Sequence, residues 1–205
     1  HWFRWEAALT WITGMTLLVV VYYLGSTAFL IDPAIADLDR DTVASIMIVG
    51  LVVVWLAYDL FWITPFAKRG GLAPGLISFF AGIAMAYGLT QLLPGRAAFI
   101  HIGAMFGTIM VANVWVRIIP AQRALVASSK TGAKPDPALA LRAKQRSMHN
   151  SYLTLPVVFI MISNHYPFIY GHPWNWALLL GISLIGAGMR YWMILFEKGR
   201  NLLWI

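Results

Sequence analysis

The sequence contains six apolar stretches, each close to the length of a membrane-spanning helix. A helix needs about 20 mostly apolar residues to cross the hydrocarbon core of a bilayer. The stretches run approximately over residues 7–30, 42–66, 73–93, 97–119, 148–168 and 174–196. Only 11% of the chain is charged, against roughly 25% in soluble domains. We therefore predict an all-α fold, a polytopic transmembrane helical bundle with six spans, as a single domain over residues 1–205.

Polar and turn-forming residues separate the apolar stretches. Pro33 and clustered acids lie between the first two, and Gly70, Gly71 and Pro94 mark the next breaks, because proline and glycine interrupt helices. The longest polar connection runs from residue 121 to residue 147 and is rich in lysine and arginine. It predicts a solvated loop that carries a short helix.

Basic residues separate to the two sides of the predicted membrane. Because lysine and arginine in short loops stay in the cytoplasm, the side with more of them faces inward. Only Arg40 and Arg96 fall on the other side. The cytoplasmic side receives Arg4, Lys68, Arg69, Arg123, Lys130, Lys134, Arg142, Lys144, Arg146, Lys198 and Arg200. We predict a multi-pass protein of the bacterial inner membrane, with a cytoplasmic loop over residues 121–147.

Two features of composition exclude classes of function. The formal net charge is +7, but these cations lie between apolar runs, so membrane orientation explains them better than nucleic-acid binding. The chain has no cysteine. Disulfides, thiolate metal sites and a CxxCH attachment for c-type haem are therefore excluded within these residues.

Ionisable and amide side chains occur near the cytoplasmic ends of the spans. In hydrocarbon such groups are costly unless paired or hydrated, so each is a functional candidate. Asn113 and Arg117 are four residues apart and share a helix face. Their amide and guanidinium groups favour binding of a planar anionic ligand. The alternative is that Asp59 and Glu6 only neutralise arginines. The full set is Glu6, Asp59, Asn113, Arg117, His149, Asn150 and Arg190.

His101 is the histidine placed deepest in a predicted span. A neutral imidazole in a helix bundle is a common axial ligand of non-covalent haem, so His101 is a candidate ligand of haem b iron. His165, at the outer end of the fifth span, is the candidate second ligand. The alternatives are an interhelical hydrogen bond for His101 and an interfacial position for His165.

Two longer sequence motifs are specific enough to suggest a protein family. They are HIGAMFGTIMVAN from His101 to Asn113, and RSMHNSYLTLP from Arg146 to Pro156, which runs on to SNHYP ending at Pro167. Together with the opening HWFRWEA, Tyr58-Asp59 and IIPAQ from Ile118 to Gln122, they resemble the membrane domain of the urate hydroxylase family, the bacterial membrane-bound urate oxidases. The likeness covers nearly the whole chain.

The resemblance implies oxidation of urate to 5-hydroxyisourate, with electrons passed to cytochrome c. It also implies a c-type cytochrome domain outside the membrane and a first helix, with its own histidine, before His1. The chain therefore resembles a fragment of that plan, with haem c only on a missing domain or a partner. The missing first helix is an alternative source of the second haem ligand.

The leading prediction is the membrane domain of an oxidoreductase that binds urate or a similar planar anion. Asn113, Asn150, Arg117 and Arg190 are the predicted substrate-binding residues. His149 or Asp59 is the predicted proton acceptor, and His101 serves the electron exit. One alternative is a non-catalytic accessory subunit of a larger respiratory or photosynthetic membrane complex. Another is a haem b electron-transfer protein.

Overall fold

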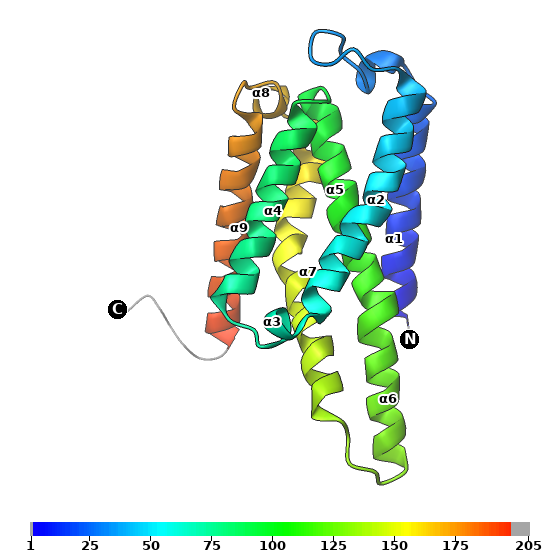
Figure 1. The fold of residues 1–205 in the computed structure, drawn as a ribbon, viewed down its shortest axis with the longest axis vertical. Helices are drawn as coiled ribbons and strands as arrows, with labels where there is room; N and C mark the ends of the chain where they lie inside the picture. Colours follow the sequence, from blue (N-terminus) through cyan, green and yellow to red (C-terminus); the bar gives the residue numbers. More distant parts are fainter. Residues whose placement is uncertain (1, 198–205) are drawn as a thin grey trace, which may run out of the picture.

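The computed structural model describes residues 2–197 as an up-and-down bundle of long helices (Figure 1). Strands are absent from these residues. The elements in chain order are α1 (Phe3–Leu18), η1 (Val19–Tyr23), η2 (Thr27–Phe29), α2 (Arg40–Ile63), α3 (Pro65–Lys68), α4 (Leu72–Thr90), α5 (Gly95–Ala112), η3 (Asn113–Ile118), α6 (Ile119–Lys130), α7 (Pro137–Ser163), α8 (Pro167–Tyr170) and α9 (Asn175–Glu197). The all-α fold is thereby confirmed.

Within residues 2–197, five helical segments are long and apolar enough to cross a membrane: Phe3–Tyr23, Arg40–Ile63, Leu72–Thr90, Gly95–Lys130 and Asn175–Glu197. The fifth predicted span corresponds to α7, which lies among them but carries polar residues. The number of six spans therefore stays a prediction. Apolar side chains on the outer faces, such as Leu17, Val52 and Ile185, are more than half exposed, as lipid contact requires.

Local sequence signals fix where the helices begin. Asp39 caps α2 by accepting from Thr42 N over 2.9 Å, and Asp136 caps α7 by accepting from Ala138 N over 2.9 Å. Pro137 occupies the first turn of α7, where a missing N–H does no harm. Gly71, with φ of 97°, makes the turn into α4 in a conformation that side chains rarely adopt.

α5 lies at the centre of the bundle and is packed by α1, α2, α4 and α7. Phe99, His101 and Ile102 of α5 are 0% exposed. Gly103 lets α7 approach closely, since a Cβ there would lie 2.6 Å from Ile160 Cγ2. The small residue thus sets the distance between α5 and α7.

Several helix ends differ from the predicted bounds. The first helical segment ends at Tyr23 rather than near residue 30, because Gly25 follows it. Residues 121–147 are more helical than the predicted loop with a short helix: α6 continues to Lys130, α7 already begins at Pro137, and residues 131–136 connect them. Good helix formers in this stretch extend both helices beyond the bundle (Figure 1).

The continuous helix from Gly95 to Lys130 has 36 residues. At about 1.5 Å per residue it is roughly 54 Å long, well beyond a hydrocarbon core of about 30 Å. α6 and the start of α7 therefore project from one end of the molecule (Figure 1). We call this the basic end, because α3 and the turn after it, the start of α1 and both projections carry the described lysines and arginines assigned to one side. Lys198 and Arg200 of that set lie outside the described residues.

Candidate functional site

The carboxylate of Asp59 lies between two guanidinium groups near the basic end. Arg117 Nε donates to Asp59 Oδ1 over 2.9 Å, and its Nη2 pairs with Oδ2. Arg146 Nη2 donates to the same Oδ1 over 2.9 Å. Asp59 and Arg146 are only 5% and 3% exposed. Buried ions persist when paired, and here two cations face one anion. The three groups together carry one net positive charge.

Three elements far apart in sequence supply this ion group. Asp59 comes from α2, Arg117 from η3 and Arg146 from α7. η3 is a stretch of π-helix, whose wider turn changes the direction of its side chains. Such turns are frequent at functional sites, and this one carries both Asn113 and Arg117.

A chain of neutral hydrogen bonds adjoins the ions. Asn150 Nδ2 donates to the backbone oxygen of Met110 over 2.9 Å. Asn113 Nδ2 donates to Asn150 Oδ1 over 2.9 Å and to Tyr58 Oη over 3.1 Å. Tyr58 Oη lies 2.7 Å from His149 Nδ1. The basic-end cluster comprises Tyr58, Asp59, Asn113, Arg117, Arg146, His149 and Asn150.

The backbone oxygen of Met110 orients the two amides of this chain. It forces Asn150 to present its amide nitrogen there and its oxygen to Asn113. Asn113 in turn donates to Tyr58, which leaves the phenol proton available to His149 Nδ1. In the tautomer with its hydrogen on Nε2, neutral His149 accepts this bond.

Two polar atoms of the cluster have no hydrogen-bond partner within residues 2–197. They are Arg146 Nη1, a donor, and Asn113 Oδ1, an acceptor, and both are buried. Both residues contact Tyr58: Asn113 through its amide, and Arg146 by stacking its guanidinium carbon 4.8 Å from the ring centroid. Unpaired buried polar atoms are uncommon in proteins and suit a ligand that carries an acceptor and a donor.

The structure brings five of the predicted site residues together: Asp59, Asn113, Arg117, His149 and Asn150. Arg190 of α9 is not part of this network. Its Nε donates to Ser151 Oγ, and its Nη1 lies 3.5 Å from Glu197 Oε1. The predicted neutralisation of Arg117 by Asp59 is present, whereas Glu6 is exposed.

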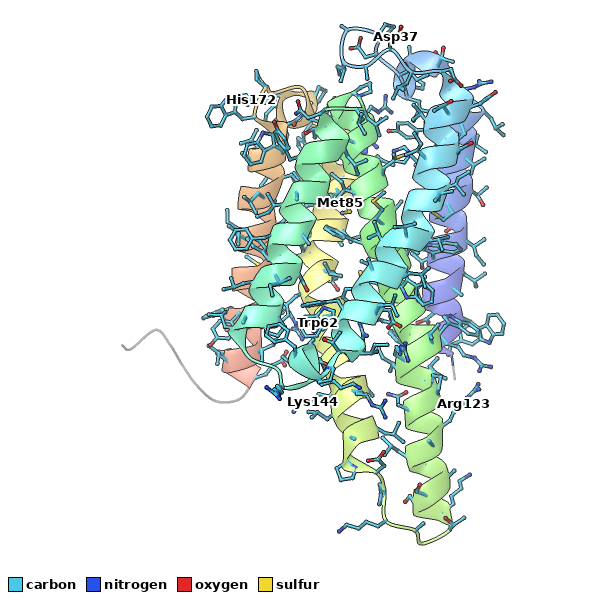
Figure 2. All side chains as sticks on the ribbon, in the orientation of Figure 1. Asp37, Trp62, Met85, Arg123, Lys144 and His172 are labelled. Carbon is cyan, nitrogen blue, oxygen red and sulfur yellow. The ribbon has the colours of Figure 1, made fainter. Side chains whose placement is uncertain are left out.

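Sequence reasoning missed Arg146, Tyr58 and Trp62. Trp62 lies with its ring centroid 4.2 Å from that of His149, and Figure 2 places it near Lys144, far from Asp37 and His172. Arg146 was assigned to the solvated loop. Its spacing of three and four residues from His149 and Asn150 places all three on one helix face, which is the signal that would have grouped them.

His101 lies near the opposite end in a separate, neutral contact. Its Nδ1 donates to the backbone oxygen of Ala97 over 2.7 Å, so its Nε2 accepts from Tyr23 Oη over 2.9 Å. The ring is fully buried, and Tyr23 comes from the π-helical segment η1. We call Tyr23 and His101 the histidine–tyrosine pair.

Haem ligation needs a free nitrogen lone pair on His101, and Tyr23 occupies it. The residues present therefore do not fit haem at His101 in this arrangement. His165 is exposed in the turn between α7 and α8. The described part of the chain contains no group of three or more His, Cys, Asp or Glu able to hold a metal ion. Haem b stays a prediction, and no step below depends on it.

The chain matches a known protein family over its whole length. The family described as "Urate oxidase N-terminal" matches residues 1–205, the whole chain. No curated protein matches the chain, and no solved structure matches it either.

Proposed function

Because the chain belongs to the urate oxidase N-terminal family, we propose that it is the membrane domain of an oxidoreductase that oxidises urate at the basic-end cluster. The observation that carries the proposal is the surplus positive charge around Asp59. Two guanidinium groups share one carboxylate, and the buried one, that of Arg146, has an Nη1 without a partner in the described residues. Urate is a planar monoanion near neutral pH, and its edge alternates C=O acceptors with N–H donors.

Arg146 and Asn113 supply the matching contacts. Arg146 Nη1 offers a charged donor to a carbonyl oxygen of the anion, and Asn113 Oδ1 offers an acceptor to a ring N–H. A preorganised charge in a dry site stabilises negative charge without reorganisation of solvent. Arg117 is partly exposed and adds positive potential at the mouth of the site.

Tyr58 and His149 supply the proton acceptor. Asp59 is paired with two arginines, so its carboxylate serves to anchor them. His149 Nδ1 lies at hydrogen-bond distance from the Tyr58 hydroxyl, which is the neighbour that passes the proton to it. We assign the proton acceptor to the Tyr58–His149 unit and a positioning role to Asp59.

The balanced reaction converts urate and water to 5-hydroxyisourate with release of two protons and two electrons. Each electron reduces one cytochrome c, either as a partner or as a domain of the same protein.

His101 of the histidine–tyrosine pair lies on the same continuous helix as Asn113. Positions 101 and 113 are roughly 18 Å apart along its axis at about 1.5 Å per residue. We propose that the basic end faces the cytoplasm of a bacterial inner membrane and that electrons leave at the opposite end.

The test measures loss of urate absorbance and reduction of cytochrome c by the full-length protein in detergent. We expect about two cytochromes reduced per urate, because the oxidation releases two electrons. Arg146→Lys keeps the charge but loses the fork geometry, so we expect kcat/KM to fall about tenfold to a hundredfold. Arg142→Gln is the matched control, since Arg142 is exposed one turn earlier on α7. Absence of turnover by the unaltered full-length protein would reject the proposal.

A second candidate is a non-catalytic membrane subunit of a larger complex. The finding that favours it is the direct pairing of Asp59 with both arginines, since paired charges also occur as structural contacts between helices. In that case urate does not bind to the purified protein, and Arg146→Lys changes stability alone. Calorimetric titration with urate separates the two candidates.

A further inference from the structure

A groove of about 530 Å³ opens at the basic end between the start of α1 and α6. It is separate from the basic-end cluster, since its lining shares no residue with it. Its charged and larger apolar lining residues are Phe3, Arg4, Ile119, Arg123, Val126 and Lys130.

The α6 residues of the groove form one face of that helix. Ile119, Arg123, Val126 and Lys130 recur at intervals of three or four residues, the spacing of one helical stripe. Ala121 and Leu125 are more buried and belong to the side that packs against α7. The stripe stays open instead: Val126 is 54% exposed.

The groove combines cations with apolar surface. Arg4, Arg123 and Lys130 are its charged residues, and no carboxylate lines it. The Arg4 guanidinium carbon lies 5.4 Å and 5.7 Å from the ring centroids of Trp5 and Trp115. Arg4 Nε is buried and has no hydrogen-bond partner among the described residues. Arg4 is thus held in place by aromatic rings while a charged donor is left for an anion.

The positions of these residues along the helix axis match the acyl and phosphate regions of a membrane lipid. The predicted fourth span ends at Ile119, and Lys130 lies roughly 16 Å further along the axis at about 1.5 Å per residue. Apolar Phe3 and Ile119 therefore border the acyl region. Arg4 and Arg123 lie at the height of the phosphates, and Figure 2 shows Arg123 just beyond the start of α1.

We propose that this groove binds an anionic glycerophospholipid from the leaflet at the basic end. The phosphate contacts Arg4 and Arg123, an acyl chain packs on Phe3 and Ile119, and Lys130 meets further negative charge of the headgroup. Basic pockets beside membrane helices bind acidic lipids by this combination of charge and apolar contact. The inference is independent of urate chemistry.

The test measures the thermal unfolding temperature of the full-length protein in detergent as lipid is added. Phosphatidylglycerol is expected to raise it saturably, while phosphatidylcholine, inorganic phosphate and deacylated glycerophosphoglycerol are expected to leave it unchanged. In Arg123→Gln/Lys130→Gln the apparent affinity for phosphatidylglycerol is expected to fall about tenfold, because each cation near the surface contributes to binding.

Lys134→Gln/Lys144→Gln is the matched control, since it removes the same charge from exposed positions outside the groove. It is expected to keep the affinity of the unaltered protein. Native mass spectrometry, which counts bound lipid, gives a readout that does not depend on stability. An equal response to phosphatidylcholine, an equal response to phosphate alone, or full affinity in Arg123→Gln/Lys130→Gln would each overturn the proposal.

Discussion

The basic-end cluster and the histidine–tyrosine pair are two buried polar sites on one continuous helix, and they differ in charge. The first contains two guanidinium groups around one carboxylate and leaves two polar atoms without partners in the described residues. In the second, both nitrogens of His101 are engaged by uncharged groups. Burial alone therefore does not distinguish the two sites. Surplus charge and unpaired hydrogen-bonding atoms do.

Asp59→Asn is expected to have the largest effect, because it leaves Arg117 and Arg146 without an anion. Breaking a buried ion pair costs about 3–5 kcal/mol. We expect a strongly lowered unfolding temperature and poor recovery of folded protein, measured by thermal unfolding and size-exclusion chromatography in detergent. Asp41→Asn is the control, since its side chain is 94% exposed. Equal stability of the two variants would remove the electrostatic distinction between the sites.

Tyr58→Phe tests the proton route within the basic-end cluster. The change removes the hydroxyl that lies between Asn113 and His149 but keeps the ring under Arg146. We expect kcat for urate oxidation to fall about a hundredfold, the usual scale of general acid–base catalysis, with little change in elution volume. Tyr191→Phe, at a position 54% exposed, is the control. An unchanged kcat would show that the phenol is only a packing group.

His101→Gln tests the histidine–tyrosine pair, the second of the two sites. Glutamine cannot reproduce both hydrogen bonds, so we expect a stability loss of about 1–3 kcal/mol and unchanged urate turnover per folded molecule. The reduced-minus-oxidised visible spectrum is recorded beside the unfolding curve, and we expect it to match that of the unaltered protein. Loss of a b-type band in the variant would contradict this and restore haem ligation by His101.

Asp39 is a surface carboxylate that serves as a reference for both buried sites. Its replacement by alanine is expected to have the smallest effect on stability. Hydrogen bonds from the Thr42 side chain and backbone hold the pKa of Asp39 below its usual 3.8. Since the folded pKa is the lower one, the stabilisation is complete well above 3.8 and is lost as the pH falls below it. Asp39→Ala should therefore lower the unfolding temperature slightly at neutral pH and have less effect at acidic pH.

Much of the bundle could be predicted from the sequence. Apolar runs of membrane length follow directly from the composition of each segment, and each of the six predicted stretches overlaps a long helix for most of its length. The ends were less predictable. α6 and the first half of α7 are helical although no long apolar run marks them, since their helix formers and the Asp136 cap act locally.

The sequence by itself determined the helical fold, the sidedness of the basic residues and five members of the basic-end cluster, because hydropathy and helix spacing are local properties. Only the tertiary structure decided which charged side chains pair with one another. Arg146 became a site residue because α7 begins early enough to bury it against Asp59, whereas Arg190 turned to Ser151 and Glu197. Those outcomes depend on the distances between helices, which side chains from several distant segments set together.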